Sequence, residues 1–213
     1  PYFPGSVNVD NDWGFAISLL YPKYLLEGLN SGVTLERTMV NIASKIEEEI
    51  SSLNIKDIKY HGVDLSISPW MEESVVELIE EYGGLQNLKS PRTLHTIYEV
   101  NREIELARKS VRNLGFNEVM LAVAEDSKAK EEVKSGTLDL NTLLSLSQVC
   151  MNGIDMVAVH NDFTVEALLL DSSVIAHIKG KPFGFRAIPV CGEEEIDMGR
   201  FGKVPVMSYF SKL

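Results

Sequence analysis

Short apolar runs recur along the chain, and each ends in a small group of polar residues. The runs are Trp13–Leu20, Gly62–Ile67, Glu118–Ala124, Gly153–Val159 and Gly184–Val190. The segments between them mostly repeat apolar residues at the spacing of one helix face. Alternating strands and helices are typical of an α/β protein with a mainly parallel sheet. We therefore predict a single α/β domain over residues 1–213, built on a mainly parallel five-stranded sheet.

The helices are predicted from apolar spacing and from the residues that begin and end them. Ser90 and Pro91 have the residue types of an N-cap and a first helical position. The helix that they open is expected to direct Leu94 and Tyr98 inward. The charged segment that follows the third strand is expected to be exposed. The predicted helices are 34–53, 75–82, 90–114, 138–149 and 164–179.

Charge and cysteine usage narrow the class of protein. The net charge is -11, from 31 acidic and 20 basic residues, which disfavours nucleic acid and anionic membranes as partners. No apolar run approaches the roughly 20 residues that span a bilayer. The two cysteines, Cys150 and Cys191, are too few for a secreted disulfide framework, so a reducing cytoplasm is expected. The chain begins without methionine, which indicates a processed chain or a fragment.

Polar residues at strand ends are the candidate ligand contacts, because parallel sheets bind ligands outside the carboxyl ends of their strands. Turn and helix-cap residues of the same types are a plainer explanation for most of them. The last two candidates lie in a loop near the end of the chain, which can equally be a solvated loop. The candidate ligand-binding residues are Ser66, Ser68, His160, Asp162, Asp197 and Arg200.

Four carboxylates form a candidate site for Mg²⁺ or Mn²⁺, which prefer hard oxygen ligands. They are Asp64, Glu125, Asp126 and Asp155. Asp64 and Asp155 stand inside otherwise apolar strands, where an unpaired carboxylate is costly. Asp64 is therefore also a catalytic candidate. A buried, hydrogen-bonded structural role explains both aspartates equally well.

Cys150 is the candidate nucleophile. It lies at a helix-to-strand junction, and His160 is the histidine close to it in sequence. A nucleophilic cysteine needs a nearby base or positive field to lower its pKa. No further motif surrounds Cys150, so a buried, inert thiol is the favoured interpretation.

Several segments together resemble a known family. They are Gly62–Pro69, Val123–Asp126 and Leu146–Val157, completed by Asp197–Met198 and Val204–Met207. These blocks look like the domain-of-unknown-function 711 family, whose members are often labelled pyruvate formate-lyase family proteins. The blocks occur in the same order over nearly the whole chain, which looks like the C-terminal half of a longer family member.

The resemblance implies the ten-stranded α/β barrel of pyruvate formate-lyase, made of two five-stranded parallel halves. This chain would supply one half, so an exposed apolar face should be covered by the missing N-terminal half or by a second protein chain, as in an oligomer. Glycyl radical enzymes carry an Arg-Val-x-Gly-type motif near the C-terminus. The nearest candidate here is Arg186-Ala187-Ile188-Pro189, which does not fit. No glycyl radical chemistry is expected.

The sequence is compatible with two functions. The leading hypothesis is an enzyme-like protein that binds a small polar or anionic molecule, with or without a divalent cation. The alternative is a non-catalytic binding or assembly module that retains the barrel fold. The residues do not decide whether the protein is an enzyme.

Overall fold

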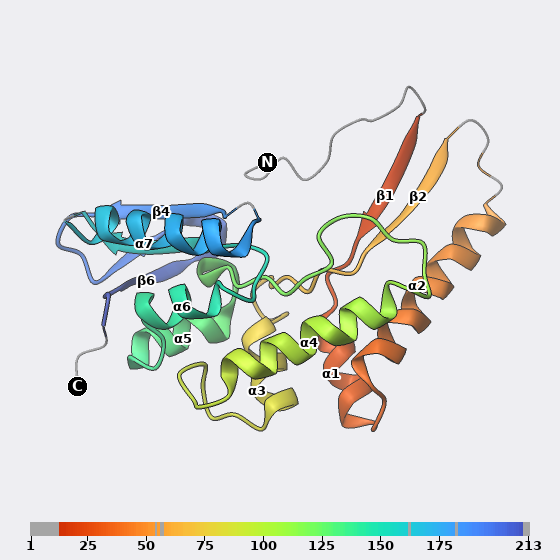
Figure 1. Ribbon diagram of the computed structural model, residues 1–213, viewed down its shortest axis with the longest axis horizontal. Helices are drawn as coiled ribbons and strands as arrows, with labels where there is room; N and C mark the ends of the chain where they lie inside the picture. Colours follow the sequence, from red (N-terminus) through yellow and green to blue (C-terminus); the bar gives the residue numbers. More distant parts are fainter. Residues whose placement is uncertain (1–12, 54, 56–57, 162, 182, 211–213) are drawn as a thin grey trace.

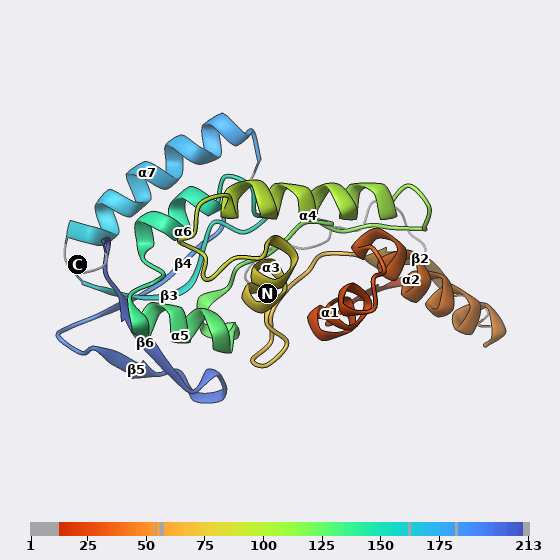
Figure 2. The ribbon, with the colours of Figure 1, turned by 90° about the horizontal axis from the view of Figure 1, so that it is seen from below.

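Two separate sheets lie at opposite ends of an elongated molecule (Figure 1). The computed structural model describes residues 13–53, 55, 58–161, 163–181 and 183–210. Helices fill the space between the sheets and pack against them, as the perpendicular view also shows (Figure 2). Within these ranges, no helix has the length and hydropathy that crossing a bilayer requires.

The strands pair mainly in parallel. The first sheet joins β1 and β2, and the second has the order β4-β3-β6-β5. Strand β3 pairs in parallel with both β4 and β6, whereas β5 pairs antiparallel with β6. The strands are β1 Gly14–Ser18, β2 Lys59–Asp64, β3 Ile154–His160, β4 Phe185–Val190, β5 Glu195–Asp197 and β6 Lys203–Met207.

The helices alternate with these strands, and one continuous cluster of buried apolar side chains reaches from α1 and α2 to α7 and β6. Two short 3₁₀ turns, η1 and η2, are Val123–Glu125 and Gly199–Phe201. The α-helices are α1 Pro22–Asn30, α2 Leu35–Ser52, α3 Val75–Gly83, α4 Thr93–Ala107, α5 Ser127–Ser135, α6 Leu140–Leu146 and α7 Phe163–Lys179.

Much of the predicted order is confirmed: the protein is a mixed α/β molecule with parallel strand pairs and alternating helices. Helix α2 begins where expected, because the Thr34 side chain accepts a hydrogen bond from the Arg37 N–H. Helix α3 ends at Gly84, which adopts a left-handed conformation with φ 58°.

The prediction of one five-stranded sheet is wrong. The strand expected over Glu118–Ala124 is an extended segment followed by η1, with an isolated bridge between Ile67 and Val119. Side chains take up backbone hydrogen bonds that a neighbouring strand would make: Asn101 accepts from the Val119 N–H, and Asn152 bonds to Leu121. The described strands therefore form two open sheets and no closed barrel.

Three helix predictions also need correction. Ser90 and Pro91 form a turn, and α4 starts after Arg92, whose left-handed backbone (φ 76°) interrupts helical continuity. The inward face of α4 is rotated, so that Leu94 and Tyr98 are exposed. The charged segment expected to be exposed contains α5, which the Asp126 side chain caps and which buries three of its nine residues.

Candidate functional site

A bulge in β3 brings a buried carboxylate against an arginine of β4. Two residues of β3, Asp155 and Met156, stand opposite the single residue Arg186. Met156 adopts φ 53°, which is rare for a residue with a side chain. Bulges redirect side chains, and they are common beside functional sites. Here the bulge lies at the amino end of the sheet.

Asp155 and Arg186 form a double hydrogen bond. Arg186 Nε donates to Asp155 Oδ1, and Arg186 Nη2 donates to Asp155 Oδ2 at 2.7 Å. The Asn152 amide also donates to Asp155 Oδ2, at 2.9 Å. Asp155 is buried, with its charge balanced by the guanidinium in a two-point arrangement. Arg186 therefore has a fixed orientation.

Glu125, at the end of η1, lies beside the same guanidinium. Its Oε1 is 3.5 Å from Arg186 Nη2. Burial is the main cause that raises the pKa of the Glu125 carboxyl, and the Asp155 charge raises it further. Arg186 and Arg200 both oppose this rise. A half-buried carboxyl with a raised pKa beside fixed charges is a common feature of functional sites.

Arg200, in η2, lies against two aromatic rings. Its guanidinium carbon is 5.2 Å from the centre of the Trp70 ring and 4.9 Å from the centre of the Phe201 ring. Lys130 of α5 donates to the Phe201 carbonyl at 2.9 Å, which ties this turn to α5. We refer to Glu125, Asp155, Arg186 and Arg200 as the charged cluster.

Asp64, the other aspartate predicted inside a strand, orders a distant loop. Its oxygens accept hydrogen bonds from the Ser66 hydroxyl at 2.6 Å and from the backbone N–H groups of Ser66, Phe116 and Asn117. Gly115 approaches so closely that a Cβ would lie 2.2 Å from Asp64 Oδ2. These contacts indicate that Asp64 and Ser66 stabilise the fold here.

Asp126 caps two helices at once. One carboxylate accepts from Ser74 Oγ and from the N–H groups of Val75 and Val76 at the start of α3. It also accepts from the N–H groups of Lys128 and Ala129 at the start of α5. Its oxygens thus have five donors, although it directly follows Glu125 of the charged cluster.

The structure does not bring the four predicted metal ligands together. Glu125 and Asp155 meet around Arg186, whereas Asp64 and Asp126 have the separate partners described above. Across the described ranges, no group of three or more His, Cys, Asp or Glu side chains is arranged to hold a metal ion. The cations beside Glu125 in the charged cluster are the guanidinium groups of Arg186 and Arg200.

Cys150 has the surroundings of a structural thiol. It is buried, and this burial raises the pKa of the thiol to about 12, with Glu118 adding to the rise and Lys179 opposing it. Lys179 Nζ donates to the carbonyl of Cys150. A thiol that stays protonated at neutral pH is a poor nucleophile.

His160 lines a cavity of about 770 Å³ at the carboxyl end of β3. The charged residues of this cavity mostly have partners in the chain: Glu195 pairs with Lys203 at 2.7 Å, and Asp139 pairs with Lys89 at 2.7 Å. The cavity is open and mainly acidic, because Glu193 and Glu194 also line it.

The remaining candidates lie elsewhere. Ser68 is half-buried in the segment after β2, and Asp197 accepts from the Gly199 N–H in the turn that leads to Arg200. Asp162 lies outside the described residues. Sequence reasoning missed Asn152, Trp70 and the pairing role of Arg186. An arginine near the start of one apolar strand and an aspartate near the start of another were the available signal for that pair.

The fold and the charged cluster define a mixed α/β protein with parallel strand pairs and an internal ion-pair network. The chain belongs to the family described as "Uncharacterised ACR (DUF711)", whose model matches residues 1–202. The family that the sequence resembles is thus confirmed. The pyruvate formate-lyase-like barrel and the C-terminal placement within longer members stay predictions.

Relatives in distant organisms carry the name UPF0210 protein. The chain is 35% identical over 165 residues to a UPF0210 protein of Methanopyrus kandleri and 34% identical over 164 residues to one of Lactobacillus helveticus. These alignments cover 70% and 71% of this chain but 35% and 36% of the relatives. The chain therefore spans about a third of the length of these curated relatives.

Proposed function

We propose that the charged cluster binds a small molecule with an oxyanion group, a carboxylate or a phosphate. The observation that carries this proposal is the position of Glu125 beside Arg186, in the field of Arg200. Glu125 presents a carboxylate to a guanidinium whose orientation Asp155 fixes. A ligand carboxylate or phosphate can make the same type of charge-assisted contact.

The exposure of the groups supports this proposal. Asp155 is buried and positions Arg186, whereas Arg200 is exposed and lies on the Trp70 ring. Arg200 can therefore meet a ligand from solvent while its guanidinium keeps its aromatic contact. Trp70 is 37% exposed, and its ring provides an apolar wall beside the charges.

Glu125 gives the proposed site a pH dependence. Its carboxylate competes with an incoming anion for the arginines. Because its pKa is raised, protonation removes this competing charge at a higher pH than for an ordinary glutamate. Anion binding is therefore expected to strengthen as the pH falls through the raised pKa of Glu125.

Isothermal titration calorimetry with acetate, oxalate and inorganic phosphate tests the proposal. Arg200→Gln should weaken binding roughly tenfold or more, because a hydrogen bond to a charged group is worth about 1.5–3 kcal/mol. Glu125→Gln should strengthen binding at neutral pH and remove the part of the pH dependence that comes from Glu125. Arg108→Gln, which changes an exposed arginine paired with Glu105 on α4, is the matched control.

Absence of heat with all three anions, or equal affinities for wild type and Arg200→Gln, would contradict the proposal. Comparison of the three probes separates the two ligand chemistries. A preference for oxalate over phosphate assigns the site to carboxylates, and the reverse preference assigns it to phosphates.

The outer face of α7 favours assembly as a second function. Leu170, Val174 and Ile178 recur at every fourth position and are 62%, 56% and 78% exposed. The opposite side of α7 packs on β3 and β4. An exposed apolar stripe on a helix that is already packed on its other side is typical of a contact surface.

We propose a second copy of this chain as the occupant of that face. An antiparallel pairing of two α7 helices about Val174 places Leu170 opposite Ile178 of the second copy. The same pairing places Asp171 opposite His177, so that the polar residues are complementary as well. Other protein surfaces, including the additional length present in the relatives, are the competing occupants.

A further inference from the structure

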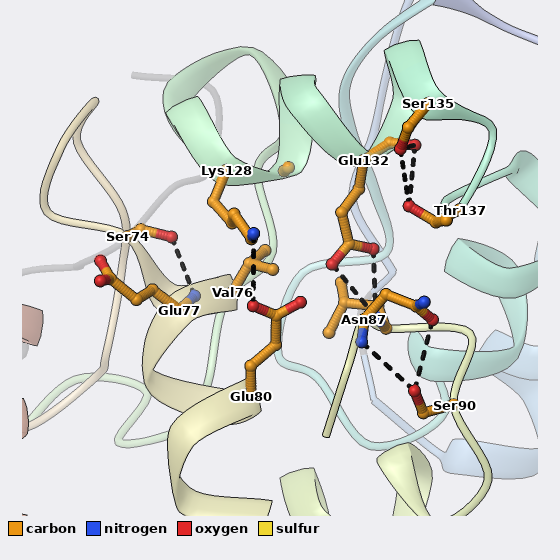
Figure 3. A network of polar contacts seen from close by, with 12 residues as sticks. Ser74, Val76, Glu77, Glu80, Asn87, Ser90, Lys128, Glu132, Ser135 and Thr137 are labelled. Carbon is orange, nitrogen blue, oxygen red and sulfur yellow. Dashed lines mark hydrogen bonds and ion pairs between the residues drawn. The ribbon is translucent and has the colours of Figure 1, made fainter. Parts of the chain in front are cut away.

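Two glutamates face each other where α3 packs against α5 (Figure 3). Glu80 lies on α3 and Glu132 lies on α5. Their carboxyl groups are within hydrogen-bonding reach, and Glu132 is only 3% exposed. Two ionised carboxylates in such a contact would repel each other and could not bond to each other, since both are acceptors.

The remaining hydrogen bonds show where a proton is needed. Both oxygens of Glu132 accept from the Leu88 N–H, at 3.2 and 3.0 Å. Glu80 Oε2 is 3.7 Å from Lys128 Nζ. Glu80 Oε1 is buried and has no hydrogen-bond partner within the described part of the chain. A buried acceptor without a partner is costly, and a proton on the facing carboxyl would satisfy it.

The surroundings favour that proton. The pKa of Glu132 is raised to about 8, mainly by burial, and Glu80 contributes to the rise as a hydrogen-bond partner and as a negative charge. The Leu88 N–H and Lys128 act in the opposite direction without cancelling the rise. The neighbouring segments contribute Lys89 and Asp139, which form an ion pair with each other.

We propose that Glu132 stays protonated at neutral pH and donates its carboxyl proton to Glu80 Oε1, so that this shared proton ties α5 to α3. Removal of the proton in alkali leaves two facing carboxylates and weakens the contact between the helices. The Asp126 carboxylate, next to Glu125, accepts hydrogen bonds from the first turns of both helices, so the contact also holds the charged cluster in place. The shared proton itself does not depend on the proposed ligand.

The direction of the pH effect follows from the raised pKa. The folded protein keeps a proton that the unfolded chain loses near the ordinary glutamate pKa. The stabilisation is fully present below that ordinary value and is lost as the pH rises through about 8. Over that interval, the folding equilibrium constant should fall by up to about tenfold per pH unit for this one group.

A carbon-13 NMR titration of the wild-type protein, labelled in glutamate side-chain carboxyls, tests the proposal directly. The Glu132 signal is assigned by its disappearance in Glu132→Gln. We expect a titration midpoint near 8, and Glu80→Gln should shift that midpoint down toward the ordinary value. A Glu132 midpoint near the ordinary glutamate value would overturn the proposal, and this measurement needs no variant beyond the assignment.

Urea unfolding between pH 5 and 9 gives an independent test. Glutamine at position 132 can donate to Glu80 Oε1 and accept from the Leu88 N–H without titrating. The difference in stability between Glu132→Gln and wild type should therefore change in favour of the variant as the pH rises. Glu131→Gln, an exposed change on the same helix, should keep the wild-type profile. Parallel profiles for Glu132→Gln and wild type would also overturn the proposal.

Discussion

The side-chain amide of Asn152 forms two hydrogen bonds with the backbone of Leu121. The Leu121 N–H donates to Asn152 Oδ1 at 2.9 Å, and Asn152 Nδ2 donates to the Leu121 carbonyl at 2.8 Å. One side chain thus supplies the donor and the acceptor that a neighbouring strand would offer. The same Nδ2 also donates to Asp155, which connects this segment to the charged cluster.

Replacement of Asn152 by alanine should destabilise the protein by about 2–5 kcal/mol, because two buried backbone groups lose partners worth about 1–3 kcal/mol each. Urea unfolding followed by circular dichroism measures this loss. Asn141→Ala, at an exposed position of α6, should change stability by less than about 0.5 kcal/mol. Equal stabilities for the two variants would show that Asn152 does not act as a strand substitute.

Asp126→Ala should cost more than the loss of an ordinary helix cap. The Asp126 carboxylate bonds to the first turns of both α3 and α5, so we expect a loss of about 2–4 kcal/mol. Thr34→Ala removes the side-chain cap of α2 alone and should cost about 0.5–2 kcal/mol. Thermal or urea unfolding of the two variants compares them. A smaller loss for Asp126→Ala than for Thr34→Ala contradicts the double-cap assignment.

Iodoacetamide should modify Cys191 and spare Cys150 in the native protein at pH 8. Cys191 is exposed, whereas Cys150 is buried with a pKa raised to about 12. Intact-mass spectrometry should show one added group, and Cys191→Ser should show none until the protein is unfolded. Rapid native labelling of Cys150 would revive it as a candidate nucleophile.

Val174→Glu should convert a dimer of the chain to a monomer, since it places two carboxylates at the centre of the proposed α7 pairing. Sedimentation velocity at several protein concentrations measures the change. Val174→Cys should also form a disulfide between copies under oxidation, because the two positions meet at the symmetry axis. The control is Leu106→Glu, at an exposed position of α4. A wild-type monomer at all concentrations contradicts the pairing.

Sequence patterns predicted the elements that depend on local chemistry. Thr34 and Gly84 mark helix ends through their own side chain or backbone preferences, so those boundaries could be read directly. The conformation of segment 118–124 could not be predicted in this way. Its backbone bonds to the side chains of Asn101 and Asn152, and a pattern of apolar residues does not reveal such partners. An apolar run indicates that a segment is buried, but it does not indicate which groups form hydrogen bonds with the backbone of that segment.

For the candidate site residues too, the sequence reveals local needs but not the partners that tertiary contacts supply. The sequence indicates that Asp64 and Asp155, inside apolar strands, need partners, and both have them. Which partners they meet depends on tertiary contacts over 31–53 residues of sequence, such as Asp155 with Arg186 and Asp64 with Asn117. Charge and spacing alone could not distinguish a helix cap from a ligand contact.

Strand β1 pairs with β2 on one side, and within the described residues its other side carries no strand. Its amide groups are therefore protected from hydrogen exchange by the hydrogen bonds of one strand pair only. This pair lies at the end of the molecule far from β3. In amide hydrogen exchange, this pair should behave as a separate cooperative unit that opens before the central strand β3, which has neighbours on both sides. The molecule would then unfold from the end that contains β1 and β2, while the charged cluster around Asp155 keeps its hydrogen bonds.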